Sequence, residues 1–205
     1  MRSEKLTRAW FAVTAVVALT GLVSQVVSTA SGDGRVANLL CFFTIDSNLL
    51  VALTSALVAL GRARGRLFTV LWLDALVGII VTGIVYQVAL AGLYELDGLA
   101  FFADTMLHKV TPILFVLGWL LAAPRGVLTW RTVWWSLLYP LAWLAFTLPR
   151  GAITGFYPYP FVDAGALGYG QVALNCVFIG LFFTALAAGA RYYDRRLSLA
   201  PDGTR

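Results

Sequence analysis

Six long apolar runs, separated by loops with Gly, Pro and charge, are the strongest constraint on how this chain can fold. A helix that crosses a bilayer core needs about 20 apolar residues at a rise of about 1.5 Å per residue. The 205 residues are 60% hydrophobic and only 12% charged, unlike an ordinary soluble domain. We expect an all-α, polytopic integral membrane protein with a single domain over residues 1–205. Its six transmembrane helices are predicted near 9–30, 37–60, 67–91, 104–122, 132–149 and 168–190.

Basic residues gather at alternate ends of these runs, and this asymmetry predicts the orientation of the helices. Of the fifteen Lys and Arg residues, only Arg35, Lys109 and Arg150 fall on one side of the predicted membrane. The other side receives Arg2, Lys5, Arg8, Arg62, Arg64, Arg66, Arg125, Arg131, Arg191, Arg195, Arg196 and Arg205. Because Lys and Arg are held back on the cytoplasmic side, we expect both termini to be cytoplasmic. The cell (plasma) membrane is the expected location of this multi-pass protein.

Several classes of partner and cofactor are disfavoured by the composition. The net charge of +5 does not indicate a nucleic-acid partner, because the Arg residues lie between apolar runs, where the bilayer explains them. Cys41 and Cys176 both fall inside apolar runs, which argues against a secreted disulfide framework and a Cys-rich metal site. With His108 as the one histidine, bis-histidine haem ligation within the chain is excluded. We expect no cofactor and no metal, with membrane lipids as partners.

Polar side chains inside the apolar runs concentrate in the outer half of the predicted membrane. Counting from the outer helix ends puts Thr44 about 10 Å deep and His108 about 6 Å deep. The other polar residues at this level are Ser24, Gln25, Ser47, Asn48, Tyr86, Gln87, Gln171 and Asn175, with Arg150 at an outer helix end. Intramembrane polar groups are costly and face the bundle interior or a cavity. Two interpretations remain open: a polar pocket toward the outer leaflet, or hydrogen bonds that hold the helices together.

Helical spacing predicts which residues of "CFFTIDSNLL" can act together. Thr44, Ser47 and Asn48 are related by three and four residues and share one face, whereas Asp46 points away from Thr44. A threonine in a membrane helix also commonly bonds the carbonyl four residues back, here that of Leu40. The sequence does not indicate what Asp46 pairs with.

The run that carries the histidine has its own spacing pattern. Asp104 and His108 are four residues apart, so the carboxylate can accept a hydrogen bond from one imidazole nitrogen and fix its tautomer. Pro112 lacks the N–H that would bond the His108 carbonyl, so we expect a kink that widens the space at the histidine. A lone histidine is otherwise often a hydrogen-bonded packing residue. Asp74 lies near the cytoplasmic end of its run, and we place it outside the site.

The motifs "FFTIDSNLL" and "DTMLHKVTPILF", together with the six-span length, resemble the androgen-induced membrane protein family. The closer similarity is to a bacterial, mainly actinobacterial, branch of small six-span proteins, carried by "FTIDSN", "HKVTP" and "LPRGAITGFYPYPF". The resemblance implies a six-helix intramembrane threonine hydrolase that cleaves fatty-acid esters of hydroxy fatty acids or related lipid esters. It puts the nucleophile on Thr44 and the catalytic histidine on His108.

Further roles follow from the chemistry that such a pair needs. Asp104 would orient the imidazole, and Asn48 or Ser47 would donate hydrogen bonds to the oxyanion. For substrate binding the candidates are Arg150, Tyr86, Gln87, Gln171 and Asn175. Arg150 suits a fatty-acid carboxylate, although an ordinary interfacial charge explains it as well. The aromatic loop 151–167 is either a lid over the pocket or an interfacial anchor.

Two other functions are compatible with an outer polar pocket. A small-molecule or lipid transporter would need polar residues that continue to the cytoplasmic side, or broken helices at the midplane. A non-catalytic lipid-binding protein would use Thr44 and His108 only to shape a cavity. The sequence specifies neither the physiological substrate nor the oligomeric state.

Overall fold

The computed structural model describes residues 2–32, 34–93, 95–123 and 125–198, and within them it contains helices and no strands, so the all-α prediction is confirmed. The elements are α1 (Arg2–Ser31), η1 (Val36–Cys41), α2 (Phe43–Ala59), α3 (Gly65–Val85), η2 (Tyr86–Leu90), α4 (Gly98–Thr105), η3 (Met106–Val110), α5 (Thr111–Ala122), α6 (Trp130–Ser136), α7 (Leu138–Thr154), η4 (Pro160–Val162) and α8 (Ala164–Ser198). Arg205 and the side chain of Arg2, both used in the orientation count, lie outside the description.

Four helical segments are long and apolar enough to cross a membrane: Glu4–Ser31, Gly65–Leu90, Gly98–Ala122 and Ala164–Ser198. The segment predicted at 37–60 is shorter, because α2 has 17 residues. The segment predicted at 132–149 is divided between α6 and α7. The chain therefore has the helices of a membrane protein, while its six spans and their orientation stay predictions.

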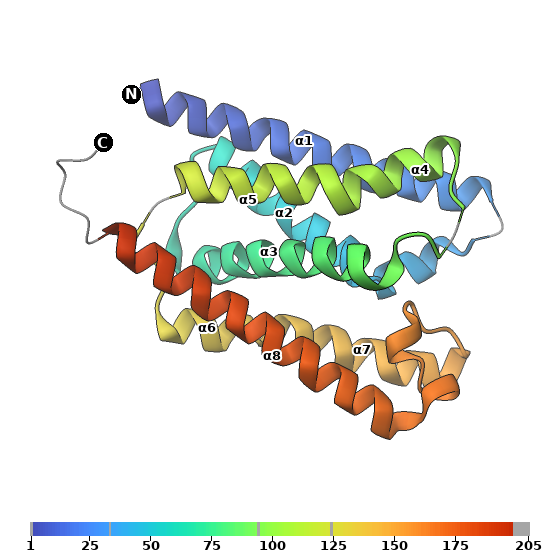
Figure 1. Cartoon of the computed structure of the whole chain (residues 1–205). Coiled ribbons are helices and arrows are strands. Elements are labelled where there is room, and N and C mark those ends of the chain that lie inside the picture. The colour runs from blue at the N-terminus through green and yellow to red at the C-terminus, as the bar shows by residue number, and fades with distance from the viewer. Residues whose placement is uncertain (1, 33, 94, 124, 199–205) are drawn as a thin grey trace.

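The helices α1 to α5 form one group, and α6, α7 and α8 lie beside it (Figure 1). α1 contacts α2, α4 and α5, and α3 contacts α2 and α5. Aromatic rings fill the centre of this group: the ring centroids of Phe11 and Trp72 are 5.1 Å apart, and those of Trp72 and Phe115 are 5.0 Å apart. α6, α7 and α8 pack against one another, and α6 and α8 contact α3. A space bounded by α3, α7 and α8 is left for the site described below.

The predicted helices are interrupted at three places. The run 37–60 is not one helix, because extended backbone at Phe42 (φ −85°, ψ 119°) separates the 3-10 helix η1 from α2. Two π-helices occur where α-helix was expected: η2 continues α3, and η3 joins α4 to α5. The irregularity predicted at Pro112 thus takes the form of a wider turn just before it, over Met106–Val110.

Two other boundaries differ from the predicted spans. The fourth segment begins at Gly98 rather than near 104, because the apolar residues before Asp104 continue the helix. The last segment extends from residue 164 to Ser198, with non-helical backbone at Gly168 (φ 75°, ψ 153°). Gly168 tolerates this left-handed φ because it has no Cβ.

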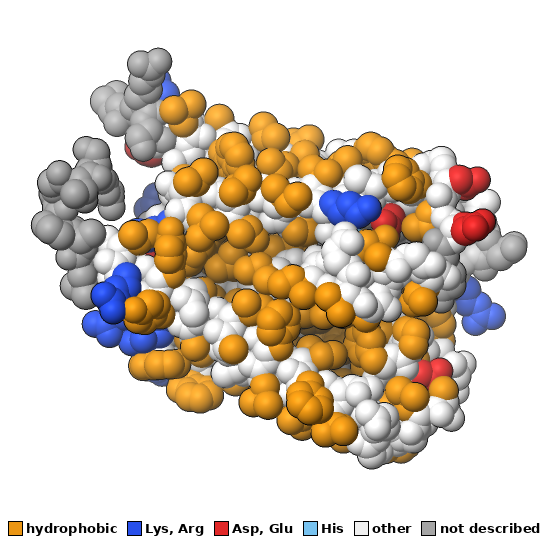
Figure 2. Space-filling model, in the orientation of Figure 1, with side chains coloured by type: hydrophobic (Ala, Val, Ile, Leu, Met, Phe, Trp, Pro, Cys, Tyr) orange, Lys and Arg blue, Asp and Glu red, His pale blue; other side chains and the backbone are white. Residues whose placement is uncertain are grey.

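Arginine side chains close the helix ends opposite to these interruptions. Arg8 Nε donates to the carbonyl of Ala59 at the end of α2 (2.8 Å). Arg125 donates to the carbonyls of Trp119 (2.8 Å) and Leu120 at the end of α5. Helix C-termini carry partial negative charge and unpaired carbonyls, so these cations stabilise them. Figure 2 shows Lys and Arg clustered at the end of the molecule where α8 finishes, and several acidic side chains at the opposite end.

The close contact between α1 and α5 predicts the effect of substitutions on stability. A Cβ at Gly118 would lie 2.5 Å from Nε1 and 2.7 Å from Cδ1 of Trp10, so Gly118→Val overpacks the interface and costs about 1–3 kcal/mol. The control is Gly189→Ala in α8, where a Cβ meets nothing within 4 Å and alanine favours the helix by about 0.5–1 kcal/mol. Thermal unfolding in detergent should show a lower Tm for the first variant and an equal or higher Tm for the second.

Candidate functional site

Thr44 lies in the first turn of α2, directly after the break at Phe42. Amide groups in the first turn of a helix have no carbonyl partner within the helix. The amide of Thr44 donates instead to the hydroxyl of Tyr159, at 3.2 Å. The threonine side chain is 7% exposed, and its Oγ1 therefore sits at a helix N-terminus inside the protein. The positive end of the helix dipole favours negative charge at this position.

His108 is held against Thr44 from η3. The distance between Thr44 Oγ1 and His108 Nε2 is 3.2 Å. The other ring nitrogen, Nδ1, lies 2.9 Å from Asp104 Oδ1, as the four-residue spacing predicts. A proton on Nδ1 is shared with this carboxylate, which leaves Nε2 as the acceptor that faces the threonine hydroxyl.

Tyr86 supports the histidine and the aspartate together. Its hydroxyl donates to Asp104 Oδ2 at 2.6 Å, and its ring stacks on the imidazole with centroids 4.0 Å apart. Tyr86 lies on η2 and His108 on η3, so both residues are carried by π-helices. A π-turn inserts one extra residue and re-aims the side chains next to it, which is why such turns recur at functional sites.

Tyr159 completes the arrangement from the loop between α7 and α8. Its hydroxyl lies 3.3 Å from Thr44 Oγ1, in addition to accepting from the Thr44 amide. Burial raises the pKa of Tyr159 to about 12, so the phenol stays protonated and keeps a hydrogen to donate. Sequence reasoning left the loop as either a lid or an interfacial anchor and assigned no role to this residue. The available signal was the pair of prolines, Pro158 and Pro160, which restrict the backbone on both sides of it.

The hydrogen bonds among Tyr159, Thr44, His108 and Asp104 can form one chain in which each group donates to the next. Tyr159 donates to Thr44 Oγ1, the threonine hydroxyl donates to His108 Nε2, and Nδ1–H donates to Asp104. In this arrangement the threonine proton points at Nε2 of the imidazole. This is the arrangement in which a hydroxyl nucleophile is activated by an adjacent base, with a third group that orients the base.

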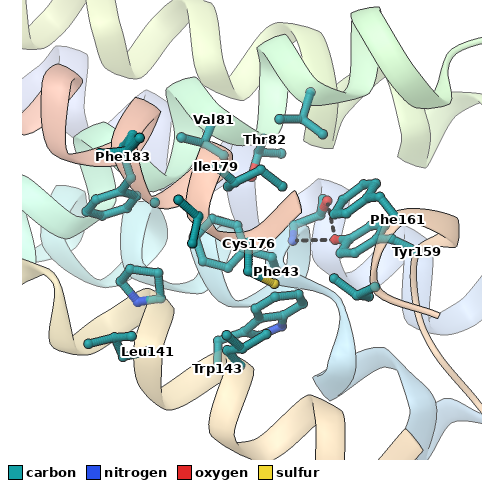
Figure 3. Close-up of a pocket in the computed structure, with 18 of the residues that line it drawn as sticks. Phe43, Val81, Thr82, Leu141, Trp143, Tyr159, Phe161, Cys176, Ile179 and Phe183 are labelled. Carbon is teal, nitrogen blue, oxygen red and sulfur yellow. Dashed lines mark hydrogen bonds between the residues drawn. The ribbon is translucent and has the colours of Figure 1, made fainter. Parts of the chain in front are cut away.

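Two cavities meet at Thr44. The first, which we call the apolar cavity, has a volume of about 350 Å³ and extends between α3, α7 and α8. The second, the histidine cavity, has a volume of about 250 Å³ and is lined by His108, Asp104 and Gln25, with Pro158 and Pro160 over it. The residues that line both cavities are Thr44, Tyr86, Leu90 and Tyr159. Figure 3 shows the apolar cavity with Tyr159 and Phe161 at one end and Phe183 and Leu141 toward the other.

Asn48 and Ser47, expected as oxyanion donors, are engaged elsewhere. Asn48 Nδ2 donates to the carbonyls of Thr44 (2.8 Å) and Leu107 (3.2 Å), and so ties α2 to η3. Ser47 Oγ lies 2.9 Å from the hydroxyl of Tyr139, on the side of α2 that faces α7. The structure brings Thr44, His108 and Asp104 together and directs these two side chains to helix contacts.

The two acidic residues that the sequence left unassigned lie apart from Thr44 Oγ1. Asp46 is half-buried in the first turn of α2, where a carboxylate interacts favourably with the helix dipole. Asp74 is 3% exposed and lines neither of the two cavities. Within the described residues, no cluster of three His, Cys, Asp or Glu side chains offers a metal site.

The remaining substrate-binding candidates lie on α7, α8 and η2. Arg150 donates to Asn38 Oδ1 at 2.6 Å and lies over the ring of Phe156, lining neither cavity. Gln171 donates to Asn175, whose amide donates to the carbonyl of Phe161. The bond from Asn175 fastens Phe161, in the Tyr159 loop, to α8. Gln87 is exposed on η2 and lines neither cavity.

Comparisons of the chain with protein-family models, with curated proteins and with solved structures find no match. The resemblance to the androgen-induced membrane protein family therefore stays a prediction that rests on its motifs.

The bonds of Asn48 predict that it stabilises the fold. Asn48→Leu removes the donors of two buried carbonyls and should cost about 1–3 kcal/mol. Thr54→Val is the matched control in α2, because the Thr54 hydroxyl donates to the carbonyls of its own helix. Thermal unfolding in detergent should give a lower Tm for Asn48→Leu and a nearly unchanged Tm for Thr54→Val. An unchanged Tm for both variants would contradict the stabilising role of Asn48 and would favour its earlier assignment as an oxyanion donor.

Proposed function

We propose that this chain is an intramembrane lipid ester hydrolase in which Thr44 is the nucleophile and His108 the general base. The observation that carries the proposal is the 3.2 Å contact between Thr44 Oγ1 and His108 Nε2, with Asp104 on the opposite ring nitrogen. The apolar cavity beside this pair supports a lipid substrate. Fatty-acid esters of hydroxy fatty acids, or related lipid esters, are the substrates that the motif resemblance favours.

The proposed reaction proceeds in two acyl-transfer steps. Thr44 Oγ1 attacks the ester carbonyl carbon while its proton passes to His108 Nε2, and the same proton then goes to the oxygen of the departing alcohol. The acyl-threonine is hydrolysed by a water whose proton is taken by His108 and returned to Thr44 as the fatty acid leaves. Asp104 stabilises the transient imidazolium, and Tyr86 holds Asp104.

The oxyanion has donors at the same place. Tyr159 O–H lies 3.3 Å from the nucleophilic oxygen and can turn toward the carbonyl oxygen as negative charge develops there. The N-terminus of α2 adds the positive end of its dipole. A tyrosine hydroxyl and a helix terminus therefore replace Asn48 and Ser47 as the proposed stabilisers.

The proposal includes the membrane arrangement. The six helical segments span the plasma membrane with both termini in the cytoplasm, which puts the Arg-capped helix ends inside and the Thr44 site toward the outer leaflet. α1 begins and α8 ends at the same end of the bundle, as an even number of spans requires (Figure 1).

Substitution of the pair should abolish turnover without loss of folding. Thr44→Ala and His108→Ala should each lower kcat on lipid esters by about 10³-fold or more, because they act as one unit. Thr54→Val is the control, with unchanged kcat. Mass spectrometry of the denatured wild type, quenched during turnover, should find the acyl group on the peptide that contains Thr44. Turnover that survives Thr44→Ala would remove the nucleophile assignment, and binding of lipid without any turnover would favour a non-catalytic lipid-binding protein.

The role of Tyr159 has a separate kinetic signature. Tyr159→Phe removes one hydroxyl and should lower kcat by about 10²-fold to 10³-fold with little change in KM, because the donor acts mainly in the transition state. Tyr157→Phe in the same loop is the control, since Tyr157 packs on Gly151 and lines neither cavity. Steady-state kinetics of both variants on one ester measure the difference. Equal kcat values for the two would contradict the assignment.

A further inference from the structure

The position of His108 relative to the two cavities distinguishes the two halves of an ester. His108 and Asp104 line the histidine cavity and are not part of the lining of the apolar cavity. Thr44 lines both, so a carbonyl carbon in contact with Thr44 Oγ1 has one substituent available to each cavity. The arrangement of the two cavities around Thr44 and His108 therefore determines which part of the ester lies in which cavity.

We infer that the apolar cavity is the binding site of the acyl chain and that the alcohol part lies in the histidine cavity, which defines the substrates as esters of long-chain fatty acids. This inference rests on the proposed hydrolase function and adds to it the direction of the substrate.

Proton transfer decides the orientation. When the tetrahedral intermediate collapses, the bond from the carbonyl carbon to the alcohol oxygen breaks, and that oxygen must take the proton held on His108 Nε2. A general acid has to be within hydrogen-bond reach of the atom that it protonates. His108 lines the histidine cavity and does not line the apolar cavity, so we place the alcohol oxygen on the side of the histidine cavity. The acyl chain, on the other side of the carbonyl, is then left with the apolar cavity.

The chemistry of the two linings agrees with this orientation. The apolar cavity is walled by hydrocarbon side chains of α3, α7 and α8, such as Val81, Leu141 and Leu181, which suit a methylene chain. It contains no charged side chain in its lining. The histidine cavity adds Gln25 and Asp104 to its apolar residues and so provides polar partners for an alcohol.

Access to the apolar cavity supports a long chain. A hollow with an orange, apolar lining is visible on the face between α3 and α8 in Figure 2, where both helices contribute lining residues. Gly180 lies in this lining, and a Cβ at its position would meet nothing within 4 Å. A chain in the cavity can therefore pass along α8 toward the lipid-facing surface. Glycine keeps the passage wide at that point.

The test narrows each cavity separately. Gly180→Phe places a ring in the apolar cavity, and Gly189→Phe puts the same ring on α8 at a position that lines neither cavity. Leu93→Trp narrows the histidine cavity. For each variant kcat/KM is measured on hexadecanoyl and butanoyl esters of one alcohol, and on butanoyl esters of a small and a bulky alcohol.

Gly180→Phe should lower the hexadecanoyl-to-butanoyl ratio of kcat/KM by about tenfold or more, because lost methylene contacts are worth roughly that factor, and should leave the alcohol ratio unchanged. Leu93→Trp should leave the hexadecanoyl-to-butanoyl ratio unchanged and should lower kcat/KM for the bulky alcohol relative to the small one. Gly189→Phe should change neither ratio. An acyl ratio that responds to Leu93→Trp and not to Gly180→Phe would overturn the orientation.

A second measurement is independent of turnover. Thr44→Ala protein is irradiated with a hexadecanoyl ester that carries a diazirine near the end of its acyl chain, and the labelled peptides are mapped. Labelling on α8 between residues 172 and 184 is expected, with loss of that label in the Gly180→Phe background. Label confined to residues that line only the histidine cavity, such as Leu93, Leu96, Pro158 and Pro160, would overturn the inference. Label on α8 in a protein whose wild type hydrolyses no ester would retain the chain site and reject the hydrolase.

Discussion

Backbone groups without helical partners are the constraint on which this site depends. In an apolar environment every unpaired N–H and C=O is costly, so a helix that is interrupted inside a bundle must find partners from neighbouring elements. The interruption at Phe42 leaves the Thr44 amide free, and Tyr159 accepts from it. The carbonyls of Thr44 and Leu107 are in turn bound by Asn48. Tyr159 and Asn48, which bind these backbone groups, are thus the same side chains that hold Thr44 beside His108.

The fold class and the pairing at the site could be predicted from the sequence because both follow from simple periodicities. Apolar runs of bilayer length indicate helices, and the four-residue spacing of Asp104 and His108 predicts the contact between their side chains that the structure contains. The depth count, which put Thr44 and His108 near one level, needs only the helical rise. These are local rules, and they hold wherever the helix stays regular.

The sequence was less informative where the helix is irregular. Thr44, Ser47 and Asn48 keep the helical spacing on which the shared face was predicted, but the spacing could not show that Asn48 bonds Leu107 and that Ser47 bonds Tyr139. The break carries no Gly or Pro, and its one visible sign is an acidic residue, Asp46, in what becomes the first turn. Tyr159 reaches Thr44 across a sequence separation of 115 residues, which no local pattern records.

The two π-helices have a consequence for how such a site can be lost. A π-turn differs from an α-turn by one added residue, so a single-codon deletion within Met106–Val110 would restore a regular helix. The helix would still be long and apolar enough for its place in the bundle. Its preceding residues, however, would rotate by about 100° relative to α5, since successive residues of an α-helix are spaced at 3.6 per turn. Asp104 would then leave its position beside Tyr86. In this architecture the length of the segment Met106–Val110, as well as the identity of its residues, determines whether Asp104 and His108 lie beside Tyr86 and Thr44.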